Sequence, residues 1–299
     1  TWEYTLDNLK GYFERVLTQD PTVTQPTIPS IHLLEAAGED PPEIAGHVIG
    51  PYLEAARLLG QRTAELHVTL ASDKDDPNFA PESFTSYYQR SLYQAMRMLA
   101  SEVFQLLTKR LATLPEGIQG KAREVLERQE EVLGLYGSIT RQRIHALRIR
   151  CHGDYHLGQV LYTGKDFIII DFEGEPARTL NERRRKRSPL QDVAGMLRSF
   201  HYAAYTALFH EVENARISAE VGPAMEQWAR FWFYWVSATF LEVASHDSFL
   251  PKDPVEIKTL LDAYLLDKAV YELGYELNNR PDWVRIPVEG ITQFLDSGG

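Results

Sequence analysis

The sequence predicts a mainly α-helical fold with one small β-hairpin. Apolar residues recur at helical spacing through most of the 299 residues, which is the pattern of helices that bury one face. The only β signal is a pair of short apolar runs at 160–162 and 167–170, separated by Thr-Gly-Lys-Asp. Two such runs joined by a short glycine-containing segment are typical of a β-hairpin.

The first half of the chain is predicted to be entirely helical. A loop rich in proline and threonine over 20–29 and a polar loop over 72–81 separate its helices. The predicted helices cover 5–17, 41–70, 82–111 and 121–135. We therefore expect residues 1–146 to form a helical subdomain.

The second half, residues 147–299, is expected to form another domain, which carries the hairpin and most of the polar chemistry. A polar segment over 174–188 follows the hairpin. Helices are then predicted over 189–210, 221–245 and 254–277.

Composition excludes several classes of protein. The net charge of −11 argues against a nucleic-acid partner, and the lack of a long apolar run argues against a membrane partner. A single cysteine, Cys151, excludes a disulfide framework and a cysteine-rich zinc site. The first residues lack the basic and apolar regions of a secretory signal, so we expect a cytoplasmic protein.

The hairpin brings two oxygen-bearing side chains together. If Thr163 pairs with Phe167, Gln159 faces Asp171 at the open end of the hairpin. Directly opposed β-carbons lie roughly 4.5–5.5 Å apart, and a register shifted by one residue moves the partner by only one position. Asp154 lies five residues before Gln159, on a glycine-containing loop that can fold back toward the pair. Because Mg²⁺ takes few protein ligands, all of them oxygens, we expect Mg²⁺ at this point.

The spacing of these residues is that of phosphoryl-transfer sites in protein kinases. In that arrangement Asp154 is the catalytic base, and Gln159, in place of the usual Asn, and Asp171 are the metal ligands. Glu173 stands where the glycine of Asp-Phe-Gly would be. We expect Glu173 to be a further metal ligand, with a substrate contact or plain solvation as the alternatives.

Neighbouring polar residues are candidates for other roles. His152 is expected to brace the loop by hydrogen bonding, and His156 is a candidate contact for a sugar or a phosphate. The basic run 182–187 includes Arg183 and Lys186, whose cationic side chains can offset phosphate charge or bind substrate hydroxyls. The alternative for this run is a solvated loop.

Six passages of the sequence resemble those of the maltokinases, which are kinase-like phosphotransferases related to aminoglycoside and choline kinases. The passages are 60–67, 91–97, 148–161, 171–176, 188–200 and 272–283. The resemblance implies ATP-dependent phosphorylation of maltose at its anomeric hydroxyl, giving maltose 1-phosphate, with Mg²⁺ as the cofactor. It also implies a trehalose synthase domain or subunit as a partner in trehalose and glycogen metabolism.

The same resemblance implies a kinase-like C-lobe over 147–299 and an intermediate subdomain over 1–146. An aspartate at the place of Asp192 commonly braces the catalytic loop in such folds, so we expect Asp192 to give structural support. The basic run takes the place of the activation segment. Nothing in the chain resembles the β-rich N-lobe, which supplies a phosphate-covering loop and a lysine. We therefore expect a fragment that has little kinase activity by itself.

Two alternatives remain open at this point. One is a phosphotransferase for another small hydroxyl acceptor, such as an aminoglycoside or choline. The other is a non-catalytic domain that docks onto trehalose synthase.

Overall fold

The chain is built mainly from helices. A computed structural model describes residues 1–172, 174, 179–214, 216–218, 220–245 and 249–296. Two small two-stranded sheets are the only β-sheets in this part of the chain, so the prediction of a mainly α fold is confirmed. Contacts divide the chain into two compact units, and each unit is assembled from three separate segments.

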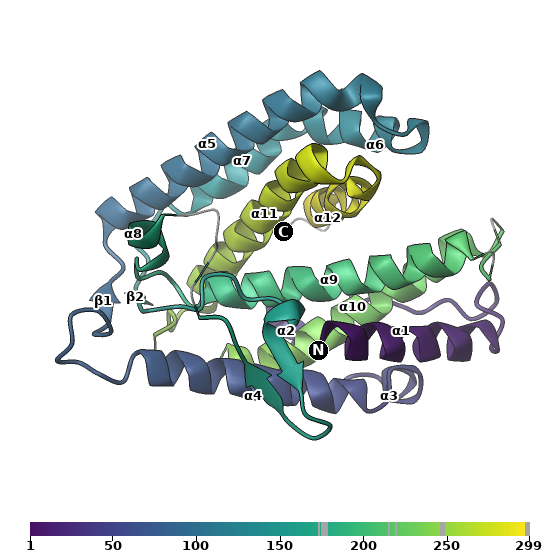
Figure 1. Cartoon of the computed structure of the whole chain (residues 1–299), viewed down its shortest axis with the longest axis horizontal. Helices are drawn as coiled ribbons and strands as arrows, with labels where there is room; N and C mark the ends of the chain where they lie inside the picture. Colours follow the sequence, from purple (N-terminus) through teal and green to yellow (C-terminus); the bar gives the residue numbers. More distant parts are fainter. Residues whose placement is uncertain (173, 175–178, 215, 219, 246–248, 297–299) are drawn as a thin grey trace. The chain divides into compact units, whose positions relative to one another are not determined.

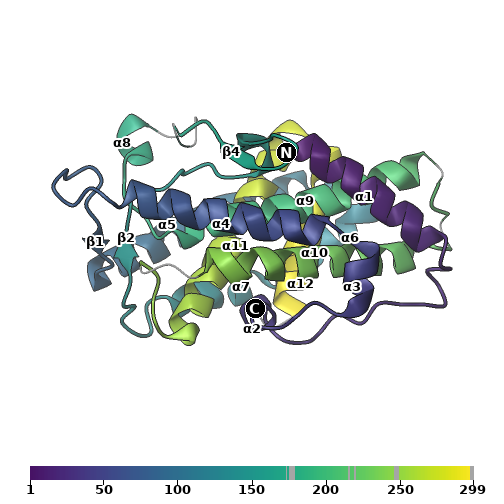
Figure 2. The same cartoon turned by 90° about the horizontal axis from the view of Figure 1, so that it is seen from below.

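The first unit comprises Thr1–Ala80, Arg150–Arg185 and Gly195–Asp247. Its helices and strands, which can be followed in Figures 1 and 2, are α1 (Trp2–Leu17), α2 (Leu33–Ala36), α3 (Glu43–Val48), α4 (Tyr52–Leu70), η2 (Leu157–Gln159), β3 (Val160–Tyr162), β4 (Phe167–Ile169), α8 (Leu180–Arg183), most of α9 (Leu190–Glu213) and α10 (Gly222–Ala244).

The close pairing of α4 with α10 is central to this unit (Figure 1). Gly60 allows the two helices to approach, because a Cβ at this position would lie 2.5 Å from the carbonyl oxygen of Phe240. The aromatic side chains of Trp228, Trp232 and Phe240 on α10 are fully buried. This packing makes α4 a firm support for the elements that contact its other faces.

The predicted hairpin is formed by β3 and β4, and it packs on α4. Val160 pairs with Ile169 and Tyr162 with Phe167, so the register differs by one residue from the predicted pairing of Thr163 with Phe167. The turn takes four residues, 163–166. Gly164 has φ +91° there, and the backbone N–H of Thr163 donates to the carbonyl of Asp166 over 2.9 Å. Because the turn closes between Thr163 and Asp166 and not between Thr163 and Phe167, the register shifts by one residue.

The second unit comprises Pro81–Ile149, Lys186–Ala194 and Ser248–Gly299. Its elements are β1 (Glu82–Ser83), α5 (Ser86–Arg110), η1 (Leu111–Thr113), α6 (Glu116–Glu127), α7 (Gln129–Ser138), β2 (Leu147–Arg148), the start of α9, α11 (Pro254–Asn279), η3 (Pro281–Trp283) and α12 (Arg285–Asp296). Helices α5, α7 and α11 pack against one another, and β1 pairs with β2.

Three details differ from the sequence-based expectations. The helix predicted over 41–70 is two helices, because Gly50 adopts φ +67° directly before Pro51. The helix predicted over 121–135 is divided between α6 and α7. The sheet of β1 and β2 is additional to the single predicted hairpin. The domain boundary at residue 147 stays a prediction.

Among the residues that the structure describes, no helix has the length and the apolar character needed to cross a lipid bilayer.

Candidate functional site

The loop that carries Asp154 is tied to the end of β4 by His152. The backbone N–H of Asp154 donates to Nδ1 of His152 over 3.4 Å. The proton of the imidazole therefore belongs on Nε2, which lies 2.8 Å from the carbonyl oxygen of Ile170. His152 is buried. Its two hydrogen bonds link the Asp154 loop to Ile170, the residue before Asp171.

Two glycines let the Asp154 loop and the segment after Asp171 touch. Gly153 has φ +86° and Gly174 has φ +75°, a backbone region that favours glycine. A Cβ on Gly153 would lie 3.5 Å from the Cα of Gly174. The Cβ of a residue at 174 would lie 3.3 Å from the Cβ of Arg183. These contacts bring α8 close to the Asp154 loop.

Gln159 and Asp171 lie together at the open end of the hairpin, as the sequence predicts. Nε2 of Gln159 donates to Oδ2 of Asp171 over 2.9 Å. Asp171 is exposed and has φ +63°, which is uncommon for a residue other than glycine and occurs often at functional sites. The backbone N–H of Ile170 donates to the carbonyl of Gln159 over 3.0 Å, so the two residues are held together by main-chain pairing as well.

The carboxylate of Asp154 lies beside His156. Oδ2 of Asp154 is 3.9 Å from Nε2 of His156, and the Asp154 side chain is 15% exposed. Nδ1 of His156 accepts from the backbone N–H of Gly158 over 3.0 Å, so its Nε2 carries the proton and faces Asp154. A Cβ on Gly158 would lie 2.7 Å from the His156 ring, which explains the glycine at that position.

Helix α9 supports the same loop from its buried face. A Cβ on Gly195 would lie 2.5 Å from the carbonyl oxygen of Tyr155, so the helix and the loop backbone are in direct contact. The hydroxyl of Ser199 accepts from the backbone N–H of Leu157 over 3.1 Å. Both contacts fix the backbone on either side of His156.

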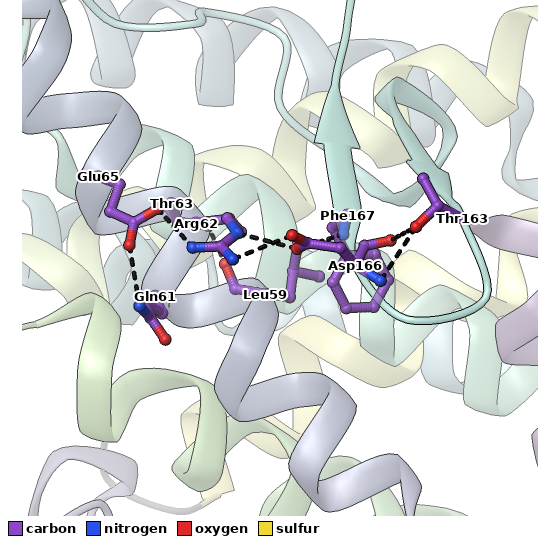
Figure 3. Close-up of polar contacts among 8 residues, drawn as sticks. All are labelled: Leu59, Gln61, Arg62, Thr63, Glu65, Thr163, Asp166 and Phe167. Carbon is purple, nitrogen blue, oxygen red and sulfur yellow. Dashed lines mark hydrogen bonds and ion pairs between the residues drawn. The ribbon is translucent and has the colours of Figure 1, made fainter.

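Helix α4 supplies two further supports, and no role was predicted for either from the sequence. The hydroxyl of Thr63 donates to the carbonyl of Leu59, so the Tyr155 hydroxyl, 2.8 Å away, donates to Thr63. Figure 3 shows the next contact, in which the guanidinium of Arg62 meets both oxygens of Asp166 at 2.9 and 3.0 Å. The hydrogen bonds from Arg62 hold the pKa of the Asp166 carboxyl below its ordinary value, and the backbone N–H of Phe167 adds to the effect.

The remaining predicted site residues occupy different places. Arg183 ends α8 in the first unit. Lys186 and Asp192 are buried and belong to the second unit, where Nζ of Lys186 lies 3.0 Å from Oε1 of Glu82. Glu173 lies outside the described residues. The roles of all these residues stay predictions.

The chain is similar to glucosamine kinases, whereas no family model matches it. It is 29% identical over 248 residues to the glucosamine kinase of Mycolicibacterium smegmatis, covering 82% of this chain and 55% of that protein. It is 26% identical over 148 residues to the glucosamine kinase of Streptacidiphilus jiangxiensis, covering 49% of this chain and 32% of that protein.

Solved structures of glucosamine kinase share the fold. One, in complex with glucosamine, ADP and inorganic phosphate, has a TM-score of 0.69 at 20% identity and covers 99% of this chain. Another crystal form has a TM-score of 0.70 and covers 100% of this chain. The chain spans about 60% of these structures and about half the length, or less, of the curated relatives above.

These findings correct the expectation of a maltokinase and of its superfamily. The relatives are kinases, as predicted, but their sugar is glucosamine and not maltose. The prediction of maltose as the acceptor and of maltose 1-phosphate as the product is therefore wrong. Trehalose synthase as a partner or docking target, and a place in trehalose and glycogen metabolism, are wrong with it. The physical reason is that the spacing of Asp154, Gln159 and Asp171 is typical of phosphoryl transfer, and the transferred group is the same for every hydroxyl acceptor.

Proposed function

We propose that this chain is part of a sugar kinase that transfers the γ-phosphoryl group of ATP to a hydroxyl of glucosamine. The observation that carries the proposal is the placement of Gln159 against Asp171, with the Asp154 loop tied to the same strand end by His152. The similarity to glucosamine kinases, one of them solved with glucosamine, ADP and inorganic phosphate, supports the choice of donor and acceptor.

The side chains of Gln159 and Asp171 fit Mg²⁺. Both offer oxygen atoms, and Asp171 is open to solvent, as a metal that also binds phosphate oxygens and water requires. No group of three or more His, Cys, Asp or Glu side chains suited to a metal occurs among the described residues, so the protein would supply only a few ligands. When bound, Mg²⁺ supplies positive charge that offsets the charge of the nucleotide phosphates.

Asp154 is the proposed general base. It would orient the acceptor hydroxyl and take its proton as the new oxygen–phosphorus bond forms and the bond from the γ-phosphorus to the bridging oxygen breaks, with ADP as the leaving group. The N–H of His156 faces the same carboxylate, and His156 is exposed enough to contact the sugar or the phosphate as well. Arg183, at the end of α8, is the proposed cationic contact for phosphate on this side of the site.

The exposed face of the hairpin is the proposed binding surface for the base of ATP. Leu161 and Ile168 are cross-strand partners on that face, and they are 49% and 52% exposed. An exposed apolar pair next to metal-ligand candidates suits the flat, largely apolar surface of a base whose phosphates reach the metal. We place the base of ATP against this pair.

The test is ADP formation by the purified full-length protein that contains this chain, with ATP and Mg²⁺, compared for glucosamine, glucose and N-acetylglucosamine. We expect ADP formation that depends on glucosamine and is lost in Asp154→Asn. Faster turnover of glucose than of glucosamine would contradict the proposed acceptor. If no sugar supports turnover and calorimetry detects no binding of ADP with Mg²⁺, the proposal of a kinase site is wrong.

A further inference from the structure

One turn of α4 contacts both halves of the candidate site. Thr63 bonds to Tyr155, the neighbour of Asp154, and Arg62 bonds to Asp166 in the turn of the hairpin whose other end carries Gln159. We call the four residues Arg62, Thr63, Tyr155 and Asp166 the α4 clamp. Tyr155 lies 92 residues after Thr63, and Asp166 lies 104 residues after Arg62.

The Thr63 half of the clamp is a buried hydrogen bond. Thr63 is fully buried and Tyr155 is 3% exposed, so neither hydroxyl has water as a substitute partner. Breaking such a bond leaves a buried polar group unsatisfied, which is costly. The position of the Tyr155 side chain, and with it the backbone next to Asp154, is therefore coupled to α4.

The Arg62 half is a two-point ion pair. Nε and Nη2 of Arg62 each donate to a different oxygen of Asp166, and such paired geometry fixes direction as well as distance. Arg62 is itself oriented, because its Nη1 donates to Glu65 over 2.6 Å, and Glu65 in turn accepts from Gln61 (Figure 3). Asp166 also accepts from the N–H of Phe167, the first residue of β4.

The hairpin transmits this constraint to the proposed metal ligands. It is only three residue pairs long, with its turn held by Arg62 and its open end formed by Gln159 and Asp171. A short two-stranded hairpin is marginally stable without such external support. The base and the metal ligands must be held within fractions of an ångström for transfer to be efficient.

We propose that Arg62 and Thr63 are positioning residues, which hold the Asp154 loop and the Gln159–Asp171 pair at a fixed spacing through one rigid helix. This inference rests on the proposed function. It assigns to α4 a role in metal affinity and in turnover, although no clamp residue is itself proposed to touch metal, nucleotide or sugar.

The test compares four substitutions with two matched controls on the same helix. Arg62→Met removes the ion pair, and Arg62→Lys restores charge without the paired geometry. Thr63→Val removes the hydroxyl at nearly constant volume, and Thr63→Ser restores it. Arg57→Met is the control for arginine, because Arg57 pairs with Glu54 and Glu242 instead. Thr69→Val is the control for threonine, because the exposed Thr69 donates to the carbonyl of Glu65.

The first readout is Mn²⁺ binding, followed by electron paramagnetic resonance, because Mn²⁺ accepts the same oxygen ligands as Mg²⁺. We expect Arg62→Met to weaken Mn²⁺ binding about tenfold, as loss of a supporting contact does in metal sites, and Arg62→Lys to recover part of the loss. Thr63→Val is expected to lower kcat about tenfold with an unchanged KM for glucosamine, and Thr63→Ser to restore kcat. The controls should match the unaltered protein.

The second readout is amide hydrogen exchange, which does not depend on activity. Arg62→Met should speed exchange in 160–169 and Thr63→Val in 152–159, with α10 unchanged in both. Unchanged exchange in both segments would overturn the inference, as would faster exchange with full Mn²⁺ affinity and full kcat. If the unaltered protein binds no Mn²⁺, the proposed function fails at its metal site, while the exchange pattern still decides whether α4 holds the loop and the hairpin.

Discussion

The side-chain amide of Gln159 donates to the carboxylate of Asp171 over 2.9 Å, across the open end of the hairpin. The contact persists although the strand register differs by one residue from the predicted one. It does so because Gln159 is the last residue before β3, and Asp171 is the second residue after β4. Local chain reversal is therefore sufficient to create the proposed metal site.

Replacing Asp171 by Asn should remove metal affinity without disturbing the backbone. Asn also tolerates the φ of +63° found at this position, so the change is confined to one charged oxygen. We expect Mn²⁺ binding to weaken about tenfold or more, measured by electron paramagnetic resonance. Asp75→Asn, in an exposed loop, is the control, and equal affinities for the two variants would contradict the assignment.

Asp154→Asn should separate binding from chemistry. Loss of a general base typically costs about 10²–10⁴-fold in rate, whereas an amide of the same shape preserves contacts to the sugar. We expect kcat to fall in that range while calorimetry still detects glucosamine. Near-native turnover in this variant would show that another group accepts the proton.

Leu161→Ala should weaken nucleotide binding without lowering stability. The side chain is half exposed in the structure, so truncation removes little buried area from the folded chain. Loss of the apolar contact between the Leu161 side chain and the base should cost about 1 kcal/mol of binding free energy, which corresponds to roughly fivefold weaker binding of ADP. Val68→Ala, at an exposed apolar position on α4, should leave ADP binding unchanged. If the two variants behave alike, the base lies elsewhere.

Two glycine substitutions should have opposite effects on the free energy of unfolding. Gly195→Ala places a Cβ against the carbonyl oxygen of Tyr155, and overpacking of this kind costs about 1–3 kcal/mol. Gly134→Ala, inside α7, meets nothing within 4 Å, so it should gain up to about 1 kcal/mol of helix propensity. Urea unfolding measures both, and a stabilising Gly195→Ala would refute the tight contact between α9 and the loop.

Acid should loosen the hairpin turn. The folded-state pKa of Asp166 is lowered by Arg62, so the contribution of this pair to stability is complete above the unfolded-state value of about 3.9. That contribution is lost as the pH falls through the lower, folded-state pKa. We expect exchange-derived protection of 160–169 to drop below about pH 4 in the native protein. Asp166→Asn should lack this step, and a step of equal size in that variant would assign it to another group.

Local sequence patterns were sufficient to predict the helical class, the hairpin, and the proximity of Gln159 to Asp171. Each depends on short-range rules: apolar spacing fixes which face of a helix is buried, and a turn between two apolar runs brings their ends together. The spacing of Asp154, Gln159 and Asp171 also predicted phosphoryl transfer, which agrees with relatives that are kinases.

The contacts that hold those residues in place depend on how distant segments pack together. The partners of Tyr155 and Asp166 lie on α4, 92 and 104 residues away in sequence, and the partner of β2 lies about 65 residues before it. An amphipathic pattern predicts which face of a helix is buried, but not which element covers that face. These pairings therefore cannot be predicted from the pattern alone. The acceptor was predicted wrongly from the sequence for a related reason: the spacing of Asp154, Gln159 and Asp171 is typical of phosphoryl transfer and carries no information about the sugar.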